Sequence, residues 1–228
     1  MERNGASVQD LTVKAYRTDN MPYRYNWHMQ GALCACNKSG IGVRNVAIYS
    51  LQSTDEPYTR PFSIYSVTDF SAQNVCVLAP NCASPVFLDQ VSDCTLDKIT
   101  VACAGAEGQP AVYVGNWPWG ASTGLSFTSV LIADAHMPFK VEAENEVVIE
   151  DSLYYGCEAE SVFDQPADVA ETNCLYYAYG TEDPGFQEID GYMLTPTNPI
   201  YDYVGWRALP EPAVFCLLVF AALFLRRK

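Results

Sequence analysis

A short pattern of apolar and polar positions recurs along this chain. In each copy a polar residue, often Asn or Asp, precedes a strand-like triplet whose apolar positions are two residues apart. The intervals between equivalent positions are 35, 29, 24, 31, 22 and 22 residues. Because the shortest interval occurs twice, we interpret about 22 residues as one coil and the longer intervals as coils with insertions. The equivalent positions are Leu11, Val46, Val75, Ile99, Val130, Ser152 and Cys174.

These repeats predict an all-β fold, a right-handed parallel β-helix over residues 1–180. Each coil leaves its sheet edge and inner face unsatisfied until the next coil stacks on it, which explains why the pattern recurs. We expect Val46, Val75, Ile99 and Val130 to form one inward-facing row with neighbours about 4.8 Å apart. The rival architecture is an antiparallel β-sandwich, which favours Asn-Gly or Asp-Gly hairpin turns. The two such dipeptides, at residues 4–5 and 190–191, separate no convincing strands.

The polar residue before each triplet predicts a turn. Asn and Asp tolerate a left-handed backbone and can form a hydrogen-bonded ladder from coil to coil. We therefore expect structural and not catalytic roles at this position, which is occupied by Asp10, Asn45, Asn74, Asp151 and Asn173.

The C-terminal residues predict a membrane-anchoring helix. Thirteen consecutive apolar residues, Ala213 to Leu225, precede the cations Arg226, Arg227 and Lys228. As a helix they would be about 20 Å long, shorter than the roughly 30 Å hydrocarbon core of a bilayer. A buried core helix normally has a polar face, however, and this run has none. The terminal cations are typical of an anchor with a cytoplasmic basic end.

This tail resembles the PEP-CTERM sorting signal of Gram-negative bacteria. The matching features are Pro210, Glu211 and Pro212, the apolar span 213–225 and the basic end. The resemblance implies export, processing by an exosortase-type membrane enzyme, and display at the cell surface or in the extracellular matrix. Residues 208–228 are thus expected to form the signal. Residues 1–7 contain no apolar secretory segment, so we expect a further N-terminal portion in the natural protein.

The segment before the tail resembles the closing segment of many bacterial parallel β-helix repeat proteins. The resemblance rests on the placement of Pro, Asp and Gly, at Asp183-Pro184-Gly185, Pro199, Asp202 and Gly205. It implies that residues 181–207 cover the exposed edge of the last coil.

Composition excludes some partners. The formal net charge of −14 opposes binding to phosphate backbones, so we expect no nucleic-acid partner. Nine cysteines include no Cys-x-x-Cys pair, and only two histidines are present, which makes a structural zinc site and other cofactors unexpected. We expect most of the cysteines to pack as small apolar side chains, with disulfides as the alternative in an exported protein.

Catalytic residues are not expected. Polygalacturonase-like enzymes carry Asn-Thr-Asp, Asp-Asp, Gly-His-Gly and Arg-Ile-Lys, and none of these motifs occurs here. No acidic cluster is recognisable around Lys98 or Lys140. Asp134 and His136 could form an acid and imidazole pair, but an isolated His at a strand end is usually only hydrogen-bonded. The alternative is a divergent polysaccharide lyase or glycoside hydrolase of the same fold.

Two aromatic insertions are candidate glycan contacts. Trp27 lies in the 35-residue interval, and Trp117 and Trp119 lie in the 31-residue interval. Aromatic rings in loops can stack on sugars, whereas the competing interpretation is that they pack over the flank of the helix. An exopolysaccharide is therefore the ligand that we consider.

Overall fold

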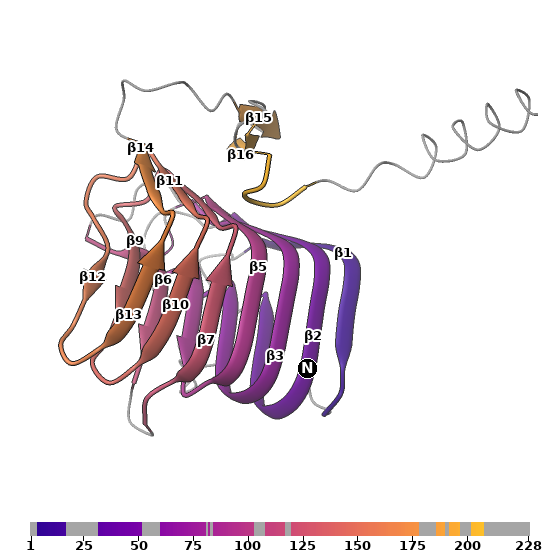
Figure 1. Cartoon of the computed structure of the whole chain (residues 1–228). Helices are drawn as coiled ribbons and strands as arrows, with labels where there is room; N and C mark the ends of the chain where they lie inside the picture. The colour runs from indigo at the N-terminus through magenta and orange to yellow at the C-terminus, as the bar shows by residue number, and fades with distance from the viewer. Residues whose placement is uncertain are drawn as a thin grey trace, which may run out of the picture.

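Equivalent strands of successive coils pair in parallel, so the chain winds into a β-solenoid (Figure 1). The computed structural model describes residues 4–16, 32–51, 60–80, 82, 84–102, 108–116, 120–177, 186–189, 192–196 and 202–207. Within these residues the one antiparallel pair is that of β15 (Phe186–Ile189) and β16 (Tyr192–Pro196). These strands flank residues 190–191, so the expectation that this Asp-Gly dipeptide separates no strands is wrong. The prediction of a parallel β-helix is confirmed, and the antiparallel sandwich is ruled out.

The solenoid has three faces, because the long strands β2 (Leu33–Leu51) and β3 (Phe62–Leu78) turn two corners and contribute to each face. Face 1 continues with β4 (Val86–Asp89), β6 (Pro110–Gly115), β9 (Met137–Val141) and β12 (Val162–Phe163). Face 2 includes the starts of β1 (Ser7–Tyr16) and β5 (Ser92–Ala102), then β7 (Thr123–Thr128), β10 (Glu146–Glu150) and β13 (Asp168–Thr172). Face 3 includes the ends of β1 and β5, then β8 (Leu131–Ala133), β11 (Leu153–Tyr155) and β14 (Leu175–Tyr177).

The corner between faces 2 and 3 is a left-handed turn in every coil. Its seven residues have φ between 49° and 58°. Five are the predicted positions Asp10, Asn45, Asn74, Asp151 and Asn173, and the other two are Lys98 and Ser129. Side-chain amides link successive coils here, from Asn45 to Asp10 at 2.9 Å, from Asn74 to Asn45 at 3.0 Å and from Asn173 to Asp151 at 3.1 Å. The predicted structural ladder is therefore confirmed.

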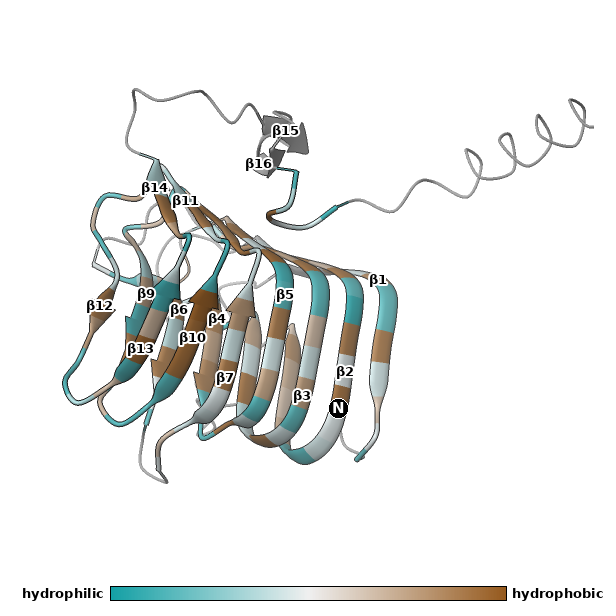
Figure 2. Ribbon diagram, in the orientation of Figure 1, coloured by the Kyte–Doolittle hydropathy of each residue, from teal (hydrophilic) through white to brown (hydrophobic). Residues whose placement is uncertain are grey.

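The core lies inside the coils. Val46 pairs with Val75 and Val75 with Ile99, Val130 continues the row, and none of the four is more than 1% exposed. This confirms the predicted inward row. Along β2, β3 and β5 in face 2, hydrophobic and hydrophilic bands alternate, as a sheet with one buried side requires, whereas the middle of β10 is hydrophobic throughout (Figure 2).

Several cysteines belong to this packing. Cys76, Cys82 and Cys94 are buried, and burial raises the pKa of the Cys76 thiol to about 12. These three thiols therefore act as small apolar side chains, as expected. None of the cysteines among the described residues is in a disulfide.

Residues 202–207, which we call the strap, cross the outside of the solenoid. The Gly205 N–H donates to the Ser129 carbonyl at 2.8 Å, the Trp206 N–H to Thr100 Oγ1 at 2.7 Å, and the Arg207 N–H to Asn74 Oδ1 at 2.6 Å. Val204 packs on Leu131 and Leu153. The strap thus runs from later coils toward earlier ones, one coil per residue.

The strap is part of the expected closing segment, and it lies along the flank of the solenoid. Coverage of the last coil by residues 181–207 stays a prediction. The predicted sorting signal, Pro210 to Lys228 with its apolar helix, lies outside the described residues. Among the residues that are described, no helix is long and apolar enough to cross a bilayer.

Candidate functional site

Two rows of outward-facing side chains on face 1 carry the most chemically varied surface of the solenoid. In these strands Phe62 and Ile64 are in the core, so the alternate positions point outward. Parallel register aligns one row as Ser63, Phe87, Tyr113, Lys140 and Val162. The neighbouring row contains Tyr65, Asp89 and Gly115, followed by Glu142 and Asp164, which continue β9 and β12.

Aromatic rings form a stack across the first coils of this surface. The ring centres of Tyr65 and Phe87 are 5.1 Å apart, and those of Phe87 and Tyr113 are 5.2 Å apart. Arg60 covers Phe87, with Cζ 3.4 Å from the ring centre, and its Nη1 donates to Tyr65 Oη at 2.9 Å. Tyr65 and Phe87 are only 6% and 4% exposed. Tyr113, which is partly exposed, is therefore the ring that a ligand could reach.

Glycine at position 115 permits this stack. A Cβ there would lie 3.3 Å from Tyr113 Cε1, which is tighter than ordinary contact, and 3.5 Å from Phe87 Cζ, which is ordinary van der Waals contact. The two rings lean over the backbone of Gly115 because no side chain occupies that space.

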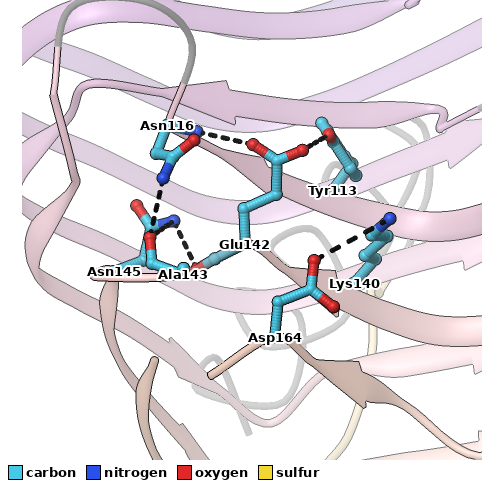
Figure 3. Close-up of polar contacts among 7 residues, drawn as sticks. All are labelled: Tyr113, Asn116, Lys140, Glu142, Ala143, Asn145 and Asp164. Carbon is cyan, nitrogen blue, oxygen red and sulfur yellow. Dashed lines mark hydrogen bonds and ion pairs between the residues drawn. The ribbon is translucent and has the colours of Figure 1, made fainter. Parts of the chain in front are cut away.

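A polar cluster adjoins Tyr113 (Figure 3). The Glu142 carboxylate accepts hydrogen bonds from the Tyr113 hydroxyl and, at 3.0 Å, from the Asn116 N–H. Lys140 Nζ lies 4.0 Å from Asp164 Oδ2 and 5.9 Å from the centre of the Tyr113 ring. We call Tyr113, Asn116, Lys140, Glu142 and Asp164 the face 1 cluster.

The side-chain amides of Asn116 and Asn145 hold this cluster in place. Asn116 Nδ2 donates to the Ala143 carbonyl at 2.9 Å, and Asn145 Nδ2 donates to the Glu142 carbonyl at 2.8 Å. Asn145 is itself fully buried and accepts from the Ser122 N–H at 2.7 Å. Its side chain therefore joins the turn after β9 to the neighbouring coil and fixes the backbone of Glu142.

Burial and the nearby carboxylate keep the Tyr113 hydroxyl protonated, so it acts as a hydrogen-bond donor. Burial, and then the hydrogen bond and the negative charge of Glu142, raise the pKa of the Tyr113 phenol well above its usual value. The hydroxyl is therefore protonated at every physiological pH and holds one Glu142 oxygen. The side chains of Lys140 and Asp164 remain 35% and 46% exposed, so a cation and a carboxylate are open to solvent beside the ring.

In the structure the His136 imidazole is paired with Glu158 and not with Asp134, the acid two residues before it in the sequence. His136 Nδ1 lies 2.8 Å from Oε2 of Glu158, which is 22 residues further along the chain. Asp134 occupies a left-handed turn with φ of 55°, and burial raises the pKa of its carboxyl group. His136 is thus paired with an exposed carboxylate of the next coil, as a hydrogen-bonded His at a strand end.

No acidic cluster is recognisable around Lys140 in the sequence, and the structure places one carboxylate beside it, that of Asp164, 4.0 Å from its Nζ. Asp164 comes from the next coil, 24 residues away, and Tyr113 comes from the coil before, so no local motif reveals them. Aligning the second strand of each coil, as well as the first, would have placed Tyr113 and Lys140 in one row. Lys98 lies exposed at the corner between faces 2 and 3.

The proposed aromatic contacts lie outside the described residues, at Trp27, Trp117 and Trp119. Within the described ranges, no group of three or more His, Cys, Asp or Glu side chains is arranged to hold a metal ion.

No protein-family model, curated protein or solved structure matches this chain.

Proposed function

We propose that this chain is an exported bacterial surface or extracellular-matrix protein whose non-catalytic, right-handed parallel β-helix binds polysaccharide at the face 1 cluster. Residues 208–228 act as a PEP-CTERM-type signal that an exosortase recognises at Pro210, Glu211 and Pro212 while the span 213–225 crosses the membrane. The sorting part rests on the sequence resemblance. The binding part rests on one structural observation, the convergence of Tyr113, Lys140, Glu142 and Asp164 on one rigid surface.

The chemistry of the cluster suits a sugar polymer. Carboxylates accept hydrogen bonds from sugar hydroxyls, the Lys140 ammonium donates to ring or hydroxyl oxygens, and the face of Tyr113 offers an apolar platform. Because strands of the solenoid hold these groups, little conformational freedom is lost when a ligand binds.

Charge narrows the class of polymer. The cluster itself has one Lys against two acids, and the whole chain has a formal net charge of −14. Such a surface repels strongly anionic chains, whereas neutral sugars or amino sugars experience no such repulsion. Neutral or amino-sugar polysaccharide is therefore the ligand that fits this site best.

Binding can be measured with soluble neutral and amino-sugar oligosaccharides by titration calorimetry. Lys140→Gln and Tyr113→Ala are each expected to weaken binding about 5- to 30-fold, since each removes a contact of roughly 1–2 kcal/mol. Lys98→Gln is the matched control, because it removes an exposed cation at the corner between faces 2 and 3, away from the face 1 cluster, and is expected to leave affinity unchanged. Equal binding by all three variants would place the ligand elsewhere.

The same convergence supports a second candidate, a divergent polysaccharide lyase or glycoside hydrolase. Two carboxylates beside a cation and a phenol are the groups that glycan cleavage uses for proton transfer. We expect no turnover on pectin, alginate or neutral glycans. Release of reducing or unsaturated sugar ends that Glu142→Gln abolishes, with the fold intact, would favour the enzyme over the scaffold.

The sorting part has its own test. Deleting residues 213–228 from a chain supplied with an export signal is expected to move the protein from the membrane fraction to the soluble fraction. Replacing Pro210, Glu211 and Pro212 by Ala should leave the protein in the membrane but unprocessed. Unchanged fractionation of the deletion variant would contradict the anchor.

A further inference from the structure

We infer that the strap sets the orientation of the solenoid on a lipid surface, with the first coils toward the bilayer and the acidic last coils away from it. This inference rests on the proposed membrane anchor. It concerns a different property, namely which surface of the solenoid meets the headgroups.

The strap moves the exit of the chain away from the last coil. The solenoid ends at Tyr177 in β14, but the strap ends at Arg207 on Asn74, which belongs to an early coil. Four ladder steps separate Asn74 from Asn173, and at about 4.8 Å each they place the last coil about 19 Å from this exit point. The order of strap contacts, Ser129, then Thr100, then Asn74, directs the chain toward the first coils.

The strap is seated firmly enough to define that exit. Asn74 both accepts from the Arg207 N–H at 2.6 Å and donates to the Arg207 carbonyl at 2.9 Å. Val204 is fully buried, and Trp206 is 9% exposed in a cluster with Tyr49, Cys76 and Leu78. At Gly205 a Cβ would lie 2.7 Å from Thr100 Oγ1, so the backbone is pressed against the solenoid.

The tether beyond the strap is short. Residues 208–212 are all that separate Arg207 from the apolar span, and five residues reach at most about 18 Å. The headgroup layer takes up roughly 5–8 Å of that distance. Asn74 and its neighbouring coils are therefore held close to the lipid surface, while the last coil can extend well beyond it.

Charge acts in the same direction. The described residues of the first two coils, 4–16 and 32–51, contain three Lys and Arg against one Asp, whereas residues 134–177 contain one Lys against eleven Asp and Glu. Anionic headgroups attract the first segment and repel the second over about a Debye length. In this orientation the half-exposed Lys140 and Asp164 of the face 1 cluster lie on the coils directed away from the membrane.

The test uses the whole chain in vesicles of phosphatidylcholine with a minority of phosphatidylglycerol and a lipid that carries a photoreactive headgroup. Cross-linked peptides are mapped by mass spectrometry. Labelling is expected to be about tenfold denser on residues 32–51 and 202–207 than on residues 137–177, because the last coil is about 19 Å farther from the exit point.

Two variants separate the strap from the anchor. Asn74→Ala removes both side-chain bonds to Arg207, and a Gly/Ser insertion of about 20 residues after Arg207 lengthens the tether without touching the solenoid. Both are expected to stay on the vesicles. The insertion should raise the labelling of residues 137–177 toward that of the first coils, and Asn74→Ala should do so to a smaller extent, because the Gly205 and Trp206 contacts of the strap remain. Asn45→Ala, which alters the same ladder but not the strap, should keep the original pattern.

Each outcome has a distinct meaning. A chain that binds the vesicles but is labelled evenly, or mainly on residues 137–177, overturns the orientation and leaves the anchor standing. An unchanged pattern after the insertion also overturns it, because a long tether cannot impose a direction. A chain that does not bind the vesicles at all overturns the anchor, and the orientation with it.

Discussion

The Asn74 side chain and the Arg207 backbone form a reciprocal pair of hydrogen bonds, 2.6 Å and 2.9 Å long, across 133 residues of sequence. The same Asn74 amide donates to Asn45 at 3.0 Å within the corner ladder. One side chain thus joins two early coils to the strap, and its conformation, with φ of 56°, favours Asn over most other residues.

Asn74→Ala is expected to lower the free energy of unfolding by about 2–4 kcal/mol, from the lost hydrogen bonds and the strain of a left-handed Ala. Asn45→Ala carries the same backbone strain, with φ of 52°, and loses two ladder bonds but no strap contact. Urea unfolding should therefore show Asn74→Ala to be the more destabilising by about 1–2 kcal/mol. Equal losses would mean that the strap contributes nothing to stability.

Gly205→Ala is expected to lift the strap. A methyl group would meet Thr100 Oγ1 at 2.7 Å and Leu131 Cβ at 3.0 Å, and φ is +75°. Hydrogen exchange at residues 204–207 should accelerate, and Trp206 fluorescence should shift to longer wavelength as the ring enters water. Gly108→Ala is the matched control, since its φ is also +75° and nothing lies within 4 Å of its Cβ. The same exchange at residues 204–207 in both variants would contradict the close approach.

The Asp134 carboxyl predicts a pH-dependent stability difference. Burial raises its pKa, so its ionised form destabilises the folded state. This cost is fully present above the raised pKa and disappears as the pH falls to the ordinary value for Asp. Asp134→Asn, which also tolerates the φ of 55°, should raise the thermal midpoint at pH 7 and have no effect near pH 3. Asp69→Asn, at an exposed turn with the same φ, should not raise the midpoint at pH 7.

Phe127→Ala is expected to cost about 3–5 kcal/mol, because the cavity would remain between stacked coils that cannot collapse independently. Phe127 is 1% exposed, and its ring centre lies 5.1 Å from that of Phe139. Val148, on the outer side of the adjacent strand, is 41% exposed, so Val148→Ala should stay within about 0.5 kcal/mol of the parent. Similar losses for the two variants would contradict the inward and outward assignment of these positions.

The repeated phrase predicted the solenoid because its physics is local. A left-handed corner followed by alternating apolar residues appears within six residues. The turn at Asn45 and the inward position of Val46 can therefore both be predicted from a short stretch of sequence. The corner holds even at Lys98 and Ser129, where the residue type gives no signal, because the coils on either side impose the register.

The strap and the face 1 cluster could not be found in the same way. Asn74 and Arg207 meet only because the chain returns along the flank, and nothing near Arg207 resembles the repeat. Lys140 and Asp164 come from different coils and meet through the register of face 1, where strands are short and their apolar pattern is weak.

A strap seated on several coils also determines how a mechanical load enters the molecule. Tension on the chain beyond residue 207 reaches the solenoid at Asn74, Thr100 and Ser129, so hydrogen bonds to three neighbouring coils share it. The edge strands β13 and β14 each pair with one neighbouring strand, and the backbone hydrogen bonds of the strap to Asn74, Thr100 and Ser129 reach neither of them. A solenoid pulled from its last coil would unwind one turn at a time, whereas in this protein the load is shared by three coils in the middle of the solenoid.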